Sequence, residues 1–304
     1  MEPGAGSETD EPFDCIVVGG GPGGLQACIH LGRYNFRALL FHRPGGRTHH
    51  AKHIENYLGL STTSGGDLIE TGLSQAKRFG VRVEGAKVER VTGSEGNFRV
   101  EAGGKTYLSR YVIAASGAKE TIAPYKNLPR FFGRAYFTCM ICDGYRTTGK
   151  KLLVIDRTIN GVRLSIGMKQ LFTKDVTFLS EGFTPAPQYA QLLDDEGIVR
   201  LEGRAEELLG EEGLEGVRLT DGRVVACEVI MGWGGISLND EYLDMLDLER
   251  DAEGFKVMTK GSGESSVPGL FVVGALRQGH SQAVISAGQG AEAAIEISAR
   301  IVEI

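Results

Sequence analysis

The sequence predicts an α/β protein of two domains, with the second domain inserted into the first. Its 304 residues are enough for two ordinary domains. A strand, glycine turn and helix follow one another near the N-terminus, and a strand–helix–strand unit begins at Lys151. A buried strand and a long helix close the chain and complete the first domain. We therefore expect a flexible tail at 1–12, one domain at 13–117 plus 247–304, and an insert at 118–246.

Composition narrows the class of protein. Hydrophobic residues make up 41% and charged residues 24% of the chain, as in globular proteins, and no apolar run reaches the length of a membrane span. A net charge of −6 argues against general nucleic-acid binding. The acidic start lacks the basic and apolar segments of a signal peptide, and five cysteines, an odd number, argue against a secreted disulfide framework. We expect a cytoplasmic protein that binds neither nucleic acid nor membrane.

The first domain opens with a dinucleotide-binding pattern. The apolar run 13–18 predicts a strand, and Gly19-Gly-Gly-Pro-Gly-Gly24 follows it before a helical segment. Gly19, Gly21 and Gly24 keep the G-x-G-x-x-G spacing, which allows a tight turn and places a helix N-terminus at a pyrophosphate. The next strand, 37–41, should end in an acidic residue that holds a ribose. His42 and Arg43 stand there instead, and a histidine can also hydrogen-bond a ribose hydroxyl.

The C-terminal part of the chain supplies the rest of this domain. The segment 267–275 predicts a turn and a buried strand, and a long helix opens at Ser281. Its first backbone N–H groups carry positive partial charge and can hold an electron-rich ring. A further strand at 111–117 ends in Ser116 and Gly117.

A pair of cysteines opens the insert. Cys139 and Cys142 are separated by two residues, close enough to form one disulfide, and this arrangement lowers the pKa of a thiol. Asp143 follows directly and offers a proton carrier. The alternative is half of a zinc site, which needs two more Cys or His ligands at suitable spacing. The other cysteines are isolated, so we favour redox chemistry and expect no metal.

The insert repeats the strand–helix–strand order but not the glycines. Strands are expected at 151–155 and 175–179, with a helix at 162–172 between them. In the connecting turn, Asp156 and Thr158 stand at the first two glycine positions, and only Gly161 remains. A carboxylate would repel a diphosphate. Glu181 follows the second strand, where NADPH would require arginines for its 2′-phosphate. The sequence therefore predicts that NADPH does not bind.

Six motifs, in this order, resemble the low-molecular-weight flavin thioredoxin reductases over nearly the whole chain. They are Gly19–Gly24, Ile54-Glu-Asn-Tyr-Leu-Gly59, Ala115-Ser-Gly117, Cys139–Gly144, Pro268–Gly274 and Gln282-Ala283. The resemblance implies two Rossmann-like FAD/NAD(P)-binding domains in three β/β/α layers, FAD in the split domain, and a homodimer. It also implies that Cys142 faces the flavin, that Cys139 exchanges with a partner disulfide, and that Asp143 transfers the proton. The FAD-contacting positions are held by Gly19, Gly21, Pro22, Gly24, His42, Arg43, Asn56, Ser116, Gly117, Gly274, Ala275, Ser281, Gln282 and Ala283.

Departures from the family point to its pyridine-nucleotide-independent branches. Ala275 replaces the usual aspartate and Ser281 the usual arginine, and the NADPH motifs are missing. We expect an FAD-dependent disulfide oxidoreductase that exchanges with a thioredoxin-like or other dithiol/disulfide protein. A ferredoxin-like electron donor is one option, and a second FAD in the insert, with Glu181 on its ribose, is another. The alternatives are a dithiol oxidase that uses oxygen, a redox sensor, and an ordinary NADPH thioredoxin reductase.

Overall fold

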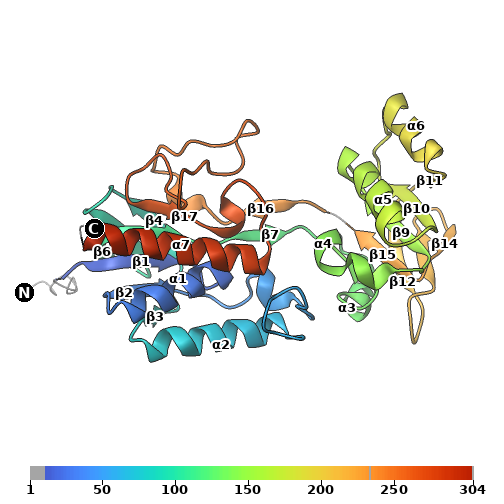
Figure 1. Cartoon of the computed structure of the whole chain (residues 1–304). Coiled ribbons are helices and arrows are strands. Elements are labelled where there is room, and N and C mark those ends of the chain that lie inside the picture. Colours follow the sequence, from blue (N-terminus) through green and yellow to red (C-terminus); the bar gives the residue numbers. More distant parts are fainter. Residues whose placement is uncertain (1–10, 233, 303–304) are drawn as a thin grey trace, which may run out of the picture. The chain divides into compact units, whose positions relative to one another are not determined.

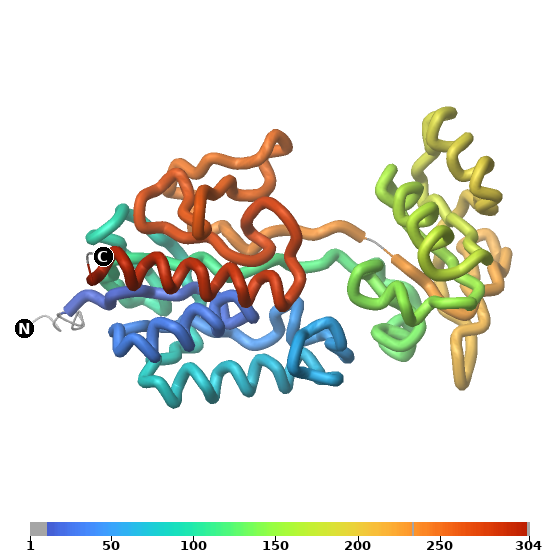
Figure 2. The backbone as a smooth tube through the Cα atoms, in the orientation of Figure 1, coloured from blue at the N-terminus to red at the C-terminus, as the bar shows by residue number. Residues whose placement is uncertain are grey.

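A computed structural model describes residues 11–232 and 234–302, so positions 1–10 of the expected tail lie outside it. The chain forms two compact units (Figure 2). Unit 1 runs to Lys119 and resumes at Ser237, and unit 2 is Glu120–Ile236. The return to unit 1 thus comes earlier than the expected residue 247. The reason is that Leu238 and Leu243 are buried, so the segment after Ser237 packs as part of the unit that it enters.

Unit 1 is built around a mainly parallel sheet of seven strands. Its central strand β1 pairs in parallel with β2 and β6, with Val18 opposite both Phe41 and Ala114. Three strands therefore end together beside the glycine turn. The first half of β6 also pairs with β5, and β5 pairs with β4, both antiparallel, so these two strands extend the same sheet. The strands are β1 (Phe13–Val18), β2 (Ala38–Phe41), β3 (Arg82–Glu84), β4 (Val88–Thr92), β5 (Phe98–Ala102), β6 (Lys105–Ala114) and β17 (Leu270–Val272).

Three helices form the remaining layer of unit 1: α1 (Pro22–Arg33), α2 (Gly65–Arg78) and α7 (Ala283–Ile301) (Figure 1). The backbones of α1 and α7 touch, since a Cβ placed on Gly290 would lie 2.0 Å from the carbonyl oxygen of Gly23. Leu31, Ile113 and Ile297 belong to the core between helices and sheet. Within the described residues, no helix has both the length and the apolar character needed to cross a membrane.

Unit 2 repeats the parallel arrangement with a sheet in the order β11-β10-β9-β15-β8. A small antiparallel sheet, β12-β13-β14, accompanies it. The strands are β8 (Tyr136–Phe137), β9 (Leu152–Asp156), β10 (Val176–Ser180), β11 (Val199–Glu202), β12 (Ala205–Leu209), β13 (Gly216–Leu219), β14 (Val224–Ala226) and β15 (Val229–Gly232). The helices are α3 (Leu128–Phe131), α4 (Met140–Asp143), α5 (Ile159–Leu171) and α6 (Pro187–Asp195). The expected β9–α5–β10 unit is present, and α5 begins earlier than residue 162.

The chain passes between the units through two short strands that pair with each other. These are β7 (Ala118–Glu120) and β16 (Ile236–Leu238). Because both passages lie in this ribbon, unit 2 is a continuous insert within unit 1. Together the units form the two Rossmann-like α/β domains that the sequence predicts.

Candidate functional site: a nucleotide cavity and a redox disulfide

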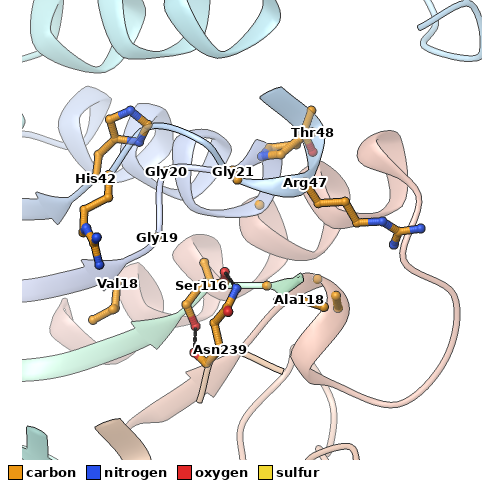
Figure 3. A pocket seen from close by; sticks show the side chains of 18 of the residues that line it. Val18, Gly19, Gly20, Gly21, His42, Arg47, Thr48, Ser116, Ala118 and Asn239 are labelled. Carbon is orange, nitrogen blue, oxygen red and sulfur yellow. Dashed lines mark hydrogen bonds between the residues drawn. The ribbon is translucent and has the colours of Figure 1, made fainter. Parts of the chain in front are cut away.

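Unit 1 holds a cavity of about 440 Å³ at the ends of β1, β2 and β6 (Figure 3). Most residues expected to contact the cofactor line it: Gly19, Gly21, Pro22, His42, Arg43, Ser116, Gly117, Gly274, Ala275, Ser281 and Ala283. The size suits a cofactor, since ligand pockets usually measure about 300–1,000 Å³. Arg43, Arg47 and Lys87 bring positive charge to the wall. The cavity therefore fits a dinucleotide with its diphosphate.

The glycines of the turn have two different roles. A Cβ on Gly24 would lie 1.9 Å from the carbonyl oxygen of Gly19, so this glycine lets α1 pack closely on β1. Gly24 is buried and belongs to the packing rather than to the cavity wall. Gly21 is the N-cap of α1, has no atom within 4 Å of its Cβ position, and faces open space. The helix starts without an acidic residue in its first turn or a side-chain cap, which leaves its N–H groups available to an anion.

His42 occupies the position of the missing acid at the end of β2. Its ring nitrogen Nδ1 is buried, and no hydrogen-bond partner reaches it among the described residues. A Cβ on Gly20 would lie 2.2 Å from this nitrogen, so only glycine leaves room for the ring. Burial lowers the pKa of His42 below its ordinary value, and the neighbouring His49 and Lys77 lower it further. The imidazole is therefore neutral at pH 7 and can accept a hydrogen bond from a hydroxyl.

Sequence reasoning missed one wall of the cavity. The Ser116 hydroxyl donates to the backbone oxygen of Asn239 (2.7 Å), and the Asn239 side-chain amide donates to the backbone oxygen of Ser116 (3.1 Å) (Figure 3). The Tyr242 hydroxyl lies 3.0 Å from that of Ser116. Asn239 and Tyr242 stand in a short polar stretch after β16 that carries no glycine motif. Only the burial of their neighbours assigns this stretch to unit 1.

Three of the expected cofactor residues, Gly24, Asn56 and Gln282, are not among those that line the cavity. The Asn56 amide donates to the side-chain oxygen of Gln282 (2.9 Å), which links the loop before α2 to the N-cap of α7. The first turn of α7 is fixed by Gln282, whose carbonyl accepts from the N–H of Ser286 (2.8 Å). Gly274 has a positive φ of 73° and donates its N–H to the Gln289 side chain, so the turn before α7 favours glycine.

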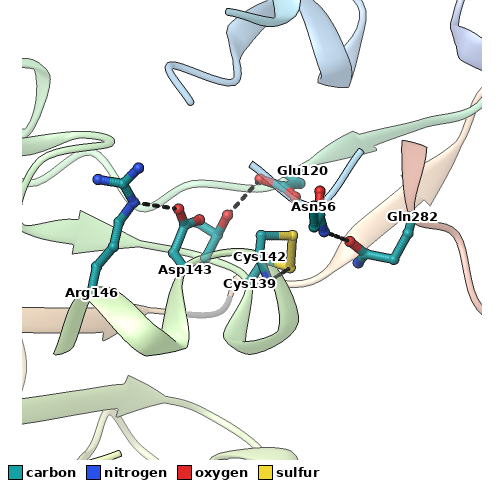
Figure 4. The surroundings of a disulfide bond; sticks show 8 residues. Asn56, Glu120, Cys139, Cys142, Asp143, Arg146 and Gln282 are labelled. Atoms are coloured by element: carbon teal, nitrogen blue, oxygen red, sulfur yellow. Dashed lines mark hydrogen bonds and ion pairs between the residues drawn. A yellow bond between two sulfur atoms is a disulfide. The ribbon is translucent and has the colours of Figure 1, made fainter. Parts of the chain in front are cut away.

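The cysteine pair forms a disulfide at the start of α4, with the two Cα atoms 5.3 Å apart (Figure 4). Cys139 is the N-cap, and its sulfur accepts the N–H of Cys142 at 3.1 Å. This contact favours negative charge on the Cys139 sulfur when the bond is open. Asp143 follows Cys142 and lies 3.6 Å from the guanidinium of Arg146. Cys139 and Cys142 are both partly exposed as residues, which leaves the pair accessible to exchange.

The three remaining cysteines are buried, and their thiols are unreactive. Burial raises the pKa of Cys15 and Cys28 well above the usual thiol value, and raises that of Cys227 to about 12. A thiol that stays protonated is a poor nucleophile and a poor metal ligand. Within the part of the chain that the structure describes, no group of three or more His, Cys, Asp or Glu residues could hold a metal.

The corresponding turn of unit 2 is closed by its own side chains. Asp156 is 2% exposed and accepts the N–H (2.7 Å) and the hydroxyl (2.8 Å) of Thr158. Thr158 in turn caps α5, with its hydroxyl accepting the N–H of Asn160 (3.2 Å) and its carbonyl that of Gly161 (3.1 Å). Three backbone donors of this turn, the N–H groups of Thr158, Asn160 and Gly161, are thus already paired.

Glu181, at the end of β10, is also fully engaged. Its side chain is 2% exposed and forms an ion pair with Arg157 at 3.0 Å. It also accepts the hydroxyl of Tyr125 (3.2 Å) and the N–H of Ala205 (2.7 Å). These contacts lock the end of β10 to the turn after β9 and to the start of β12. The carboxylate is therefore a structural residue of unit 2.

The fold and these two sites define a class: a dinucleotide-binding α/β protein with a redox-active disulfide. The family model for pyridine nucleotide-disulphide oxidoreductases matches residues 13–291, and the chain belongs to this family. It is a flavin disulfide oxidoreductase of the thioredoxin reductase type, with Cys139 and Cys142 as its C-x-x-C pair.

Individual relatives agree with this assignment. The chain is 27% identical to the thioredoxin reductase of Bacillus subtilis, with 96% of each chain covered. It is similar to the crystal structure of HlmI, with a TM-score of 0.90, 26% identity, and 98% and 95% of the two chains covered. The thioredoxin reductase of Streptococcus pyogenes shares the fold, with a TM-score of 0.88, 23% identity, and 97% and 100% coverage.

Proposed function

We propose that this chain is an FAD-dependent thiol–disulfide oxidoreductase that binds FAD in unit 1 and does not take electrons from NADPH. The observation that carries the proposal is the contrast between the two glycine turns. The start of α1 is open and rimmed by cations, whereas the start of α5 is capped by Asp156 and Thr158. The two units thus contain the same β–turn–α arrangement. In unit 1 the helix start is open to a ligand, and in unit 2 side chains of the protein occupy it.

Charge adds to this contrast. A diphosphate at the turn of unit 2 would meet the Asp156 carboxylate, which is unfavourable at close range in a partly buried site. The ribose and 2′-phosphate end would meet Glu181, whose oxygens are already occupied, while the guanidinium of Arg157 is held by that same carboxylate. These contacts support the proposal, because side chains of the protein occupy both points at which NADPH would be recognised.

The same reasoning favours one FAD per chain over two. A second FAD in unit 2 would need Glu181 for its adenosine ribose, and that side chain is buried with three donors. Releasing it would break an ion pair and two hydrogen bonds. The ratio of flavin absorbance at 450 nm to protein concentration tests this point, and two flavins per chain would contradict it.

In unit 1 the open N–H groups of α1 would hold the diphosphate, His42 the adenosine ribose, and the first turn of α7 the ring end. Arg43 and Arg47 would balance the phosphate charge. When bound, FAD supplies a two-electron centre that can exchange with a disulfide. The remaining cofactor residues from the sequence, Asn56 and Gln282, would orient the start of α7 through their mutual hydrogen bond.

Chemistry at the pair is thiol–disulfide exchange. The Cys139 thiolate attacks the partner disulfide, forming a mixed disulfide and releasing one partner thiolate. Cys142 gives its proton to Asp143 and attacks the Cys139 sulfur, which forms the Cys139–Cys142 bond and releases the second partner thiolate. The partner gains two electrons, and its thiolates take up two protons. The partner is a thioredoxin-like or other dithiol/disulfide protein, and we place the reaction in the cytoplasm and in a homodimer.

As electron donor in place of NADPH we propose a ferredoxin-like protein. A ferredoxin near −400 mV lies roughly 130 mV below thioredoxin near −270 mV, about 6 kcal/mol downhill for two electrons. Anaerobic titration of the protein with NADPH, NADH and reduced ferredoxin, followed by the flavin spectrum, tests the proposal. We expect bleaching by ferredoxin alone. Bleaching by NADPH would instead identify an ordinary NADPH thioredoxin reductase.

A further inference from the structure

We infer that Arg146 is a positioning residue that holds Asp143 in its ionised form and supplies the positive charge that favours thiolate at the Cys139–Cys142 pair. The inference rests on the thiol–disulfide exchange proposed above. It starts from one ion pair, in which Nε of Arg146 lies 3.6 Å from Oδ1 of Asp143 (Figure 4). The side chains are 24% and 23% exposed, so water screens this pair less than it screens a surface pair.

Backbone geometry brings the two side chains together. After α4 the chain continues as a 3₁₀ turn at Gly144–Thr147, in which side chains three residues apart stand above one another. Gly144 fixes this turn against α5, since a Cβ there would lie 2.5 Å from the ring of Phe172. The Thr147 hydroxyl closes the turn by donating to the carbonyl of Gly144 at 2.7 Å. Arg146 is thereby held on the side of Asp143.

A second contact restricts the guanidinium. Its carbon lies 5.1 Å from the centre of the Tyr145 ring, a cation–π distance. Two contacts on a flexible side chain reduce the number of positions that it can adopt. Arg146 therefore acts as a fixed charge beside the disulfide turn rather than as a freely moving surface cation.

Charged residues of both signs lie next to the disulfide turn. On its own segment they are Asp143 and Arg146, and from β7 Glu120 accepts the hydroxyl of Thr138 at 3.1 Å, directly before Cys139. Two neighbours from α5 and its C-cap are uncharged: Gly167 beside Met140, and the ring of Phe172 beside Gly144. Arg146 thus offsets two carboxylates that would otherwise oppose a thiolate.

The consequence is a site suited to accept a proton. An ionised Asp143 takes the Cys142 proton as that sulfur attacks the mixed disulfide, the Cys139–Cys142 bond forms, and the partner sulfur leaves with its electron pair. Without Arg146 the thiolates lose a nearby cation while the carboxylates of Asp143 and Glu120 remain. The loss of this cation raises the pH at which the pair becomes nucleophilic.

The test is the pH dependence of alkylation of Cys139 and Cys142 in the reduced protein, read by mass spectrometry of the modified peptides. In Arg146→Gln we expect the midpoint to move upward by about half to one pH unit. Arg146→Met, which keeps the stem that packs near Tyr145, should give the same shift. Arg146→Lys should stay close to the wild-type midpoint. Arg223→Gln is the control, because it removes a cation from an exposed ion pair of the same unit with Asp221.

An unchanged midpoint in Arg146→Gln and Arg146→Met would overturn the inference, as would an equal shift in Arg146→Lys, which would indicate a purely structural role. Because alkylation needs neither flavin nor partner, its result is independent of the proposed function. Reduction of a thioredoxin-like disulfide by the wild-type protein tests that function separately.

Discussion

Thr158 and Asp156 hold each other at the start of α5: the Asp156 carboxylate accepts both the N–H and the hydroxyl of Thr158, at 2.7 and 2.8 Å. In unit 1 the position that corresponds to Thr158 is held by Gly21. This residue has no side chain and leaves the helix start open. The loss of two glycines therefore did more than remove space. In unit 2 the Asp156 carboxylate holds Thr158, and Thr158 caps the helix start that is open to an external anion in unit 1.

The glycine turn of unit 1 allows a paired test of packing against binding. Gly24→Ala would press a methyl group into the Gly19 carbonyl, 1.9 Å away, and should lower the free energy of unfolding by about 1–3 kcal/mol. Gly21→Ala meets open space and an ordinary φ of −79°, so the apoprotein should unfold like wild type. Its methyl group should nevertheless lower the flavin-to-protein ratio. Urea unfolding and absorbance at 450 nm check both, and full flavin retention by Gly21→Ala would be contrary to the proposed diphosphate position.

The ion pair between Arg157 and Glu181 predicts a difference in stability between two arginine variants. Arg157→Ala leaves a carboxylate that is 2% exposed with two hydrogen bonds and no counter-charge, which should cost about 1–2 kcal/mol. Arg200→Ala removes an exposed pair with Asp194 and should cost less than about 0.5 kcal/mol. Urea denaturation of both variants measures this, and equal costs would show that Glu181 does not depend on Arg157.

Asp156 should give the protein a characteristic dependence of stability on pH. Burial raises the pKa of Asp156 above its ordinary value of 3.8, so the folded protein binds this proton more tightly than the unfolded chain. Stability is then lost as pH rises from 3.8 through the raised value. Asp156→Asn removes this term, and its thermal midpoint should gain on wild type as pH rises from about 4 to about 7. A constant difference would mean that Asp156 titrates normally.

The two cysteines should differ when each is changed to serine. Cys142→Ser leaves Cys139 to form a mixed disulfide that nothing resolves, so the partner protein should remain covalently attached. Cys139→Ser should trap much less, because the sulfur that accepts the Cys142 N–H is gone. Non-reducing electrophoresis after incubation with an oxidised thioredoxin-like protein measures the adduct. Stronger trapping by Cys139→Ser would reverse the roles of the two sulfurs.

The elements around the glycine turns could be predicted from the sequence, because local patterns determine them. The apolar run at 13–18 and the glycines after it produced β1 and the start of α1 as expected. The second domain boundary was not predictable in the same way, since Asn239 and Tyr242 join unit 1 through contacts with Ser116, a residue far away in the chain. The sequence offered Glu181 as one option for a ribose contact of a second FAD, and it could not reveal the contacts with Tyr125 and Ala205, because these residues come from distant segments.

The central claim is that the disulfide pair exchanges electrons with bound FAD while NADPH does not. The most direct measurement is flavin absorbance at 450 nm in an anaerobic sample, first after excess NADPH and then after a reduced dithiol protein. We predict an unchanged band after NADPH, bleaching after the dithiol, and no dithiol bleaching in Cys142→Ser. Rapid bleaching by NADPH, or a dithiol response that persists in Cys142→Ser, would contradict the account.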